Sequence, residues 1–391
     1  MKISIEKACA AMFAAVMLSL ILDIGGAFGL KYGISALLLL WVLVLVVMLG
    51  IRRDLAIEFG LLLFFAFSVS YSLFRGIELA DIYGQLSFLV YFALLFDVLY
   101  IPRNAAADIF RRTMVFGSLI VIGTFLVILL FPITLVIWKT LGDTYRLGFL
   151  GQQSVGDQLL PNVYYRWSMW LIPAFIVSVG RFHLSTIVIG VAALITLSTS
   201  VITFTLLGTI LLAILLQHGH VFKLRNLGVL MLASFFVLAI FELNFSIIGL
   251  LYENVVSKFS ASSFSTSVKL GHIEGVLASV NASTSNALVG MGVGSEFYSP
   301  GNDSYVTNIE VSHFNFVRQF GLIGGAFFFG YVLYVIVSAF ATDALGKRWA
   351  IGLLMLFLAA GTNPLLMSPV FMVVLVTVRS YVARFEDERA N

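Results

Sequence analysis

The chain alternates long apolar runs with short polar segments, many of them basic. A membrane-spanning helix needs about 20 consecutive, mostly apolar residues, so the pattern predicts about twelve transmembrane helices. The predicted spans are residues 8–22, 34–50, 55–74, 84–100, 114–137, 167–179, 184–198, 201–216, 227–243, 313–340, 349–361 and 367–379. We expect an all-α polytopic membrane protein.

Composition supports a membrane protein and leaves little sequence for other domains. Hydrophobic residues make up 60% of the chain and charged residues only 11%, against about 25% charged in soluble proteins. Too little polar sequence remains for a separate soluble domain, so residues 1–391 are expected to form one membrane domain. The single cysteine, Cys9, excludes an intramolecular disulfide, and no basic patch indicates nucleic-acid binding.

The first apolar run has two interpretations. Lys2 and Lys7 precede it, as in a secretory signal that is later cleaved. Asp23 and the glycines at positions 25, 26 and 29 instead look like a loop after a retained helix. We expect the helix to be retained.

Basic residues set the expected orientation, because lysine and arginine concentrate on the cytoplasmic side of membrane proteins. The apolar stretch 184–217 decides this orientation. Two helices turning at 198–200 place 15 of the 23 basic residues inside, whereas one helix would reverse the orientation of all downstream segments. We therefore prefer the two-helix hairpin. The inside residues are then Lys2, Lys7, Arg52, Arg53, Arg103, Arg111, Arg112, Arg181, Lys223, Arg225, Lys347, Arg348, Arg379, Arg384 and Arg389.

This orientation leaves two long segments on the outer face, residues 138–166 and 244–312. Loops longer than about 15 residues are uncommon in compact proteins and are usually functional or disordered. Both segments keep aromatic residues and isoleucines among the polar ones. We expect them to be partly ordered.

Chemically demanding residues gather where the second outer segment meets the run 313–340. His313 follows Ser312, a favourable helix N-cap residue. A histidine at this place is a candidate general base; hydrogen bonding of its ring to a backbone carbonyl is the alternative. Among the five histidines, only His313 and His272 fall on the outer side.

Three arginines also fall on the outer side. Arg318 and Asn315 are three residues apart and share one helix face, whereas His313 lies about 140° around the helix from Arg318. A cation inside an apolar run is costly and is usually functional. Arg146 and Arg166 belong to the first outer segment. Because arginine pairs bidentately with phosphate oxygens, we expect an anionic partner; contact with lipid phosphates is the alternative.

The remaining candidates are weaker. Gly290, Gly292 and Gly294 lack the strand, helix and lysine of a nucleotide-binding loop, so we expect them to shape a turn. The outer segment also contains the cation Lys269 and the acid or base residues His272 and Glu274. The sequence has no metal-ligand spacing, and we expect neither a metal nor a cofactor.

The order of these motifs resembles the bacterial O-antigen ligase and polysaccharide polymerase family. GMGVG at 290–294 precedes SHFNFVRQFGLIGG at 312–325, in which His313, Asn315 and Gly-Leu-Ile-Gly match the family motif, with Phe314 inserted. Arg146-Leu-Gly and Pro161-Asn162 are similar to two earlier elements. The turn at 198–201 lies where many members carry Ser-Arg, but it has no arginine. The similarity extends over about residues 146–340, and its specific motifs lie in the last third.

This resemblance implies a glycosyltransferase of the GT-C type in a bacterial inner membrane, with its site facing the periplasm. The donor would be an undecaprenyl-diphosphate-linked oligosaccharide, and the reaction would need no metal. His313 would remove a proton from the acceptor hydroxyl and the anomeric configuration would invert. The diphosphate would be bound by Arg146, Arg166, Arg318 and Asn315.

Three functions remain open. The first is polymerisation of lipid-linked repeat units into O-antigen, capsule or exopolysaccharide, because the sequence departs from the tighter ligase pattern. The second is an O-antigen ligase that transfers the glycan to lipid A core. The third is a lipid-linked glycan transporter, which internal repeats or intramembrane charge pairs would favour; the sequence indicates neither. Expected partners are membrane lipids, a chain-length regulator and a flippase.

Overall fold

The fold is mostly helical. The computed structural model describes residues 2–50, 55–155, 158–179, 184–215 and 264–390. Within these residues every predicted apolar run contains helix, and the run 227–243 lies outside them. Six helical stretches in the described part are long and apolar enough to cross a membrane. A membrane protein is therefore supported, and twelve spans stay a prediction.

The first half of the chain forms α1 (Lys2–Leu22), α2 (Leu30–Leu49), α3 (Ala56–Phe74), α4 (Leu79–Leu86), the 3-10 segment η2 (Ser87–Ala93), α5 (Leu94–Val98), α6 (Arg103–Leu130), η3 (Pro132–Thr134), α7 (Leu135–Thr144), β1 (Gly148–Val155) and β2 (Gln158–Tyr165). The second half forms η4 (Ser168–Trp170), α8 (Leu171–Ser178), α9 (Leu184–Ile195), α10 (Thr199–Leu215), α13 (Phe264–Asn281), α14 (Thr284–Val289), β3 (Phe297–Ser299), β4 (Ser304–Val306), α15 (Ser312–Phe340), α16 (Ala344–Ala359) and α17 (Pro369–Ala390).

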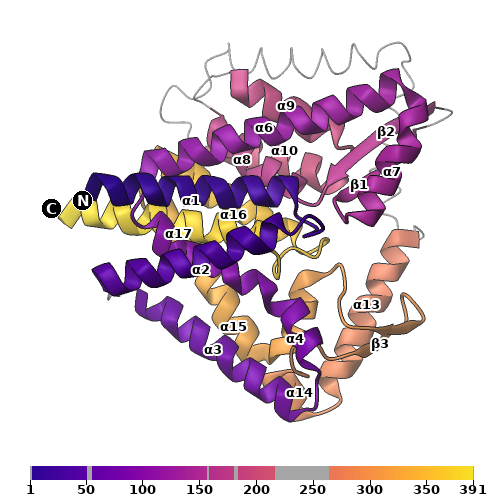
Figure 1. The fold of residues 1–391 in the computed structure, drawn as a ribbon. Coiled ribbons are helices and arrows are strands. Elements are labelled where there is room, and N and C mark those ends of the chain that lie inside the picture. The colour runs from indigo at the N-terminus through magenta and orange to yellow at the C-terminus, as the bar shows by residue number, and fades with distance from the viewer. Residues whose placement is uncertain (1, 51–54, 156–157, 180–183, 216–263, 391) are drawn as a thin grey trace.

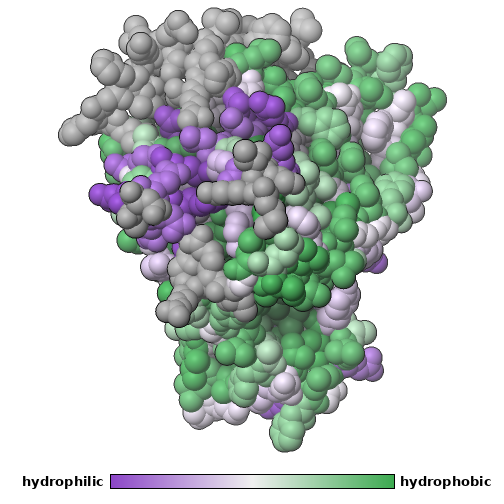
Figure 2. Space-filling view, turned by 60° about the vertical axis from the view of Figure 1, so that its left-hand side comes forward, coloured by the Kyte–Doolittle hydropathy of each residue, from purple (hydrophilic) through white to green (hydrophobic). Residues whose placement is uncertain are grey.

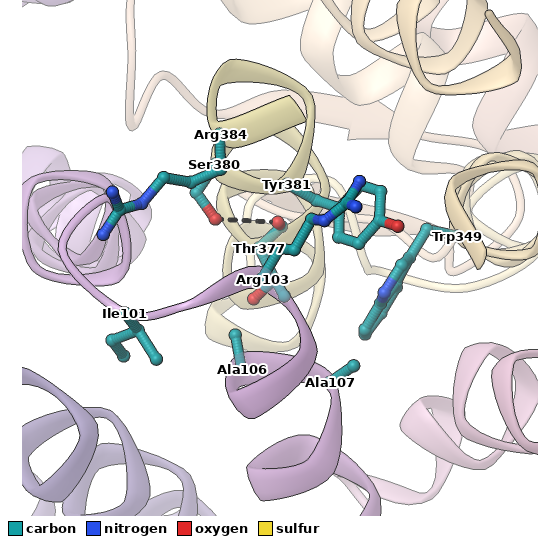
Figure 3. Close-up of a pocket in the computed structure, with 9 residues that line it drawn as sticks. All are labelled: Ile101, Arg103, Ala106, Ala107, Trp349, Thr377, Ser380, Tyr381 and Arg384. Atoms are coloured by element: carbon teal, nitrogen blue, oxygen red, sulfur yellow. Dashed lines mark hydrogen bonds between the residues drawn. The ribbon is translucent and has the colours of Figure 1, made fainter. Parts of the chain in front are cut away.

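The two ends of the helical bundle differ (Figure 1). Both chain termini lie at one end, which we call the terminal end. The opposite end, the hairpin end, carries α7, the β1–β2 hairpin, α13 and β3. Figure 2, with the terminal end brought forward, shows hydrophilic residues gathered in one area and hydrophobic residues over most of the remaining visible surface. An apolar flank of this kind suits contact with lipid.

Small residues and aromatic rings hold the central helices together. Trp349 of α16 meets Phe110 of α6 edge-on, with 5.2 Å between ring centroids. Gly352 of α16 faces α8 so closely that a Cβ atom there would lie 3.0 Å from Pro173. Small residues permit such close helix packing in apolar surroundings. The result is a tight block onto which the elements of the hairpin end are fixed.

The helix boundaries confirm the expected turn in the stretch 184–217, because α9 ends at Ile195 and α10 begins at Thr199. The described parts of 138–166 and 244–312 contain ordered helices and strands, and at least partial order was expected. The apolar pattern did not predict these strands: Gly148 pairs with Tyr165 in one antiparallel hairpin, and Phe297 pairs with Val306 in the other. The description as all-α is therefore too narrow at the hairpin end.

Helix α15 is broken at Gly321, which has a φ angle of 68°. An unbroken helix would direct the N–H groups of residues 322 and 323 to the carbonyls of Arg318 and Gln319. Here Met291 N donates to Arg318 O (2.8 Å) and Gly292 N donates to Gln319 O (3.2 Å). A Cβ atom at 321 would collide with the Leu288 carbonyl oxygen. The break thus lets another segment bond to the helix backbone.

We predict that Gly321→Ala lowers stability while Gly330→Ala does not. The first change forces a side chain into a strained positive φ and a collision, at about 1–3 kcal/mol. Gly330 lies on the same helix with no atom near its Cβ position, so alanine there should be neutral or stabilise by up to about 1 kcal/mol. The measurement is the melting midpoint of the full chain in detergent; equal midpoints would contradict the prediction.

We also predict that the hairpin end faces outward. Asn302 is exposed beside the β3–β4 turn, and Asn104 is exposed at the start of α6. In a Cys9→Ala background, a membrane-impermeant maleimide should label the Asn302→Cys protein in intact spheroplasts. The Asn104→Cys protein should react only after permeabilisation. The reverse pattern would overturn the orientation.

Candidate functional site

Arg318 is fully buried on α15 near the hairpin end. Its Nη1 donates to the Ser295 carbonyl (2.6 Å) and to the Ser295 hydroxyl (2.9 Å). Its Nη2 donates to Thr307 O (2.8 Å) and Asn315 Oδ1 (2.9 Å), and Nε donates to Asn315 Oδ1 (3.2 Å). The Phe297 ring lies 4.5 Å from the guanidinium carbon. Every N–H of the guanidinium thus has an acceptor.

This saturation changes the role expected for Arg318. No carboxylate pairs with it among the residues that the structure describes. In this arrangement it has no N–H left for a phosphate oxygen. It instead joins three pieces of chain, namely α15, the segment after the glycine-rich turn and the loop before α15. Arg318 is therefore a positioning residue.

Asn315 extends the same network, and its contact with Arg318 agrees with the shared helix face. Its Nδ2 donates to Asn308 Oδ1 (2.7 Å), which also accepts Ile309 N (2.9 Å). The chain entering α15 is thereby tied to the helix. His313 lies on a different face, and no described contact joins it to Arg318.

The glycine-rich turn has positive φ at Gly290, Gly292 and Gly294, of 89°, 96° and 81°. It packs between α3, α4 and the break in α15. Besides the two bonds to α15, Val293 N donates to Ser72 Oγ of α3 (2.7 Å). A Cβ atom at 294 would lie 2.9 Å from the backbone of Asp81 on α4. The N–H groups at 291–293 are therefore directed at protein acceptors rather than at a ligand.

His313 lies half-buried at the start of α15, between aromatic rings. Its ring is perpendicular to Phe357 of α16 at 4.7 Å and tilted against Phe329 at 5.5 Å. Within the described part of the chain it has no hydrogen-bond partner. Among the described residues, therefore, no backbone carbonyl holds the ring and neither ring nitrogen has a hydrogen-bond partner.

Ser312 does not cap α15 as expected. The N-cap position is Val311, which makes no side-chain cap bond. The Ser312 hydroxyl instead donates to Asn363 O (2.6 Å) and accepts Leu365 N (2.7 Å). The Asn363 side chain donates in turn to Ser200 Oγ (3.0 Å). The turn at 198–201 therefore reaches the residue next to His313 through the loop between α16 and α17.

Arg146 and Arg166 come together at the base of the β1–β2 hairpin. Arg146 precedes β1 and Arg166 follows β2, and Arg166 N donates to Leu147 O (2.9 Å). Both side chains are exposed, and no described acid forms an ion pair with either. Partial burial and repulsion from Arg146 lower the pKa of Arg166. The two positive charges therefore share one place.

Lys31 is a third cation near this place, where the charge of Arg166 acts on it. It lies directly after the loop that follows α1. In this loop the buried carboxylate of Asp23 accepts hydrogen bonds from Phe28 N (3.0 Å) and Lys31 N (3.2 Å). The Phe28 ring stacks on Tyr145 at 4.9 Å, which docks this loop on the hairpin. We call Arg146, Arg166 and Lys31 the cation group.

Tyr164 connects the cation group to the segment that leads into α15. Burial raises its pKa; the charge of Arg166 opposes this shift, and that of Glu310 adds to it. Glu310 lies three residues before His313 in the sequence. Its carboxylate pairs with Lys269 (3.4 Å), not with His313. Charges from both outer segments thus act on Tyr164.

The weaker candidates have mainly structural contacts. His272 is buried, and its Nδ1 lies 2.6 Å from Ser299 Oγ, which joins α13 to β3. Burial lowers its pKa, and Glu310 opposes that shift. Glu274 is exposed beside a surface hollow. The described residues contain no group of three His, Cys, Asp or Glu side chains suited to a metal. His183, His218 and His220 lie outside them.

A buried charge pair joins two helices, and the sequence did not indicate it. Glu58 of α3 and Arg379 of α17 are both buried, and Arg379 Nε donates to Glu58 Oε1 (2.6 Å). Tyr331 of α15 donates to the same oxygen (3.0 Å). The residues are too far apart in the sequence for spacing to reveal the pair. It ties the second half of α15 to two neighbouring helices.

We predict that Arg318→Lys lowers stability more than Arg146→Lys. Lysine offers its donors from one point and cannot reach Ser295, Thr307 and Asn315 together. Each buried acceptor left unpaired costs about 1–3 kcal/mol. The melting midpoint of the full chain in detergent measures the effect. The same substitution at exposed Arg146 is the matched control, and equal midpoints would show that the buried network is not required.

Within the described part of the chain, the site thus combines a buried positioning network, a histidine whose ring has no hydrogen-bond partner and the cation group. Comparison with known proteins finds no matching family model and no matching curated protein sequence.

Proposed function

We propose that this chain is a polysaccharide polymerase, a metal-independent inverting glycosyltransferase of the bacterial inner membrane. It would join undecaprenyl-diphosphate-linked repeat units on the periplasmic face. One observation carries the proposal. Charges from two segments far apart in the sequence act on Tyr164: that of Arg166 in the cation group, and that of Glu310, three residues before His313.

The cation group suits a diphosphate. Arginine and lysine side chains bind phosphate oxygens through charge-assisted hydrogen bonds. Arg146 and Arg166 have no acidic partner among the described residues, so their charge is available to a ligand. A lipid-linked donor would keep its polyprenyl chain beside the apolar helices and its diphosphate at the bundle end. The cations would then stabilise negative charge on the leaving diphosphate.

His313 suits the role of general base. The acceptor hydroxyl would give its proton to a free imidazole nitrogen and attack the anomeric carbon of the donor. The bond between that carbon and the diphosphate oxygen would break, and its electron pair would stay on the diphosphate. Attack from the opposite face inverts the configuration. The aromatic rings of Phe329 and Phe357 limit water around the histidine.

The buried network supports this arrangement without touching the substrate. Arg318 and Asn315 fix the first turns of α15, on which His313 stands. The glycine-rich turn holds the break in the same helix. Their part in the proposal is to hold the start of α15, and with it His313, in one place.

Two other functions are weighed against this one. An O-antigen ligase would use the same donor and the same residues with lipid A core as acceptor. The Glu58–Arg379 pair favours a transporter of lipid-linked glycans, because buried charges often mark transport pathways. Tyr331 binds the same carboxylate, and the pair is buried on all sides in this conformation. We therefore retain the enzyme.

We predict that His313→Ala abolishes long-chain polysaccharide in a strain that lacks the chromosomal gene. Loss of a general base typically removes a factor of about 10²–10⁴ in rate. Arg146→Asn and Arg166→Gln should reduce chain synthesis, asparagine being chosen at 146 because it tolerates the φ of 50° there. Lys139→Gln, in the same outer segment, is the charge-matched control. Gel profiles of surface polysaccharide at equal protein level provide the measurement.

Wild-type chain lengths in the His313→Ala strain would refute the active-site assignment. The product left in the deletion strain separates the functions. A polymerase loss leaves single repeat units on the lipid A core or lipid carrier. A ligase loss leaves long chains on the carrier and bare core. A transporter loss leaves donor on the inner leaflet.

A further inference from the structure

The hairpin end carries a surface hollow that the proposed reaction does not use. Its volume is about 330 Å³, within the range of about 300–1,000 Å³ typical of small-molecule sites. It lies between α13 and the β3–β4 hairpin. The residues lining it are Glu274, Gly275, Ala278, Ser279, Tyr298 and Pro300. Neither His313 nor the cation group belongs to it.

The floor of the hollow is firmly built. A Cβ atom at Gly275 would lie 2.6 Å from the Tyr298 carbonyl oxygen, so helix and strand touch backbone to backbone. Behind them His272 bonds Ser299, and both side chains are buried. Val276 and Phe297 belong to a small apolar core below. A hollow on such a base keeps its shape without a ligand.

Aromatic side chains stand on the hairpin side of the hollow. Tyr298 lines it and is 45% exposed, and its ring packs edge-on against Tyr305 at 5.7 Å. The Tyr298 hydroxyl donates to the Asp303 carboxylate, which fixes the side chain. An exposed ring with a fixed orientation is a platform on which the C–H face of a sugar can stack, because the ring face is electron-rich.

Polar groups stand on the helix side. Glu274 is exposed and forms no ion pair among the described residues, so its carboxylate can accept hydroxyl hydrogens. The side-chain hydroxyl of Ser279 donates to Gly275 O (2.7 Å) and still has lone pairs free. A fixed aromatic ring opposite a free carboxylate suits a hydroxyl-rich ligand and repels a phosphate.

We propose that this hollow is a glycan-binding subsite, which holds a stretch of the sugar chain away from the reacting bond. The inference rests on the proposed function, since it assigns the ligand as part of the polymerase's own oligosaccharide. Its position fits. Lys269, on the helix that forms one wall, pairs with Glu310, three residues before His313. A chain lying in the hollow would therefore continue toward the proposed reaction site.

The test uses the full chain in detergent and oligosaccharides released by mild acid from the surface polysaccharide of the strain that carries the gene. Saturation-transfer NMR and titration measure binding without any reaction. Tyr298→Ala should weaken binding at least tenfold, and Glu274→Gln should weaken it several-fold. Tyr298→Phe keeps the ring but loses the bond to Asp303, so it should bind more weakly than wild type and more tightly than Tyr298→Ala. Tyr305→Ala, outside the hollow's lining, reports on loss of the hairpin itself through its melting midpoint.

The outcomes separate this inference from the proposed function. His313→Ala should bind the oligosaccharide normally while making no long chains. Tyr298→Ala should still polymerise, with shorter modal chain length. Undiminished binding by Tyr298→Ala, or no binding by the wild type, would overturn the subsite and leave the polymerase proposal standing. Normal binding together with wild-type chains in His313→Ala would instead refute the active-site assignment of His313 and leave the subsite standing.

Discussion

The hairpin end depends on one buried cation. Arg318 has no carboxylate partner among the described residues, and its charge is stabilised by carbonyl, hydroxyl and amide oxygens and by the Phe297 ring. A buried guanidinium is costly unless all its donors are satisfied. Those acceptors come from separate pieces of chain, so each piece must hold its place for the charge to be tolerated. The unfavourable burial of a charge thereby enforces one conformation around α15.

The broken helix completes this constraint. Gly321 interrupts α15 directly after the Arg318 turn. The carbonyls of Arg318 and Gln319, which lose their helical partners at the break, accept hydrogen bonds from the glycine-rich turn. In apolar surroundings an unpaired carbonyl is expensive, so a helix break is stable only where another chain segment supplies donors. The glycines at 290 and 321 permit the close approach. The break and the glycine-rich turn are thus two halves of one structural element.

The sequence predicted the elements of this region, but not which of its polar residues hold the fold and which are left exposed. The apolar runs and the turn at 198–200 follow from hydropathy and charge, because both are local properties. The helical repeat placed Asn315 beside Arg318 for the same reason. The partners of Arg318 could not be predicted, since Ser295 and Thr307 lie in irregular chain whose path has no periodicity. The roles of Lys31 and Asn363 were not predicted either. Each reaches the site through a tertiary contact, and in the sequence each is only a polar residue between two apolar runs.

The structure separates two uses of arginine that look alike in the sequence. Arg318 lies in an apolar run and was expected to bind the diphosphate together with Arg146 and Arg166, yet all its donors bond to the protein. Arg146 and Arg166 flank a hairpin that hydropathy did not reveal, and their donors face outward. A buried cation organises the fold because it is satisfied, and an exposed pair can bind a ligand because it is not. An arginine can therefore bind a substrate when its N–H groups have no acceptor in the protein. Its position within an apolar run does not decide this.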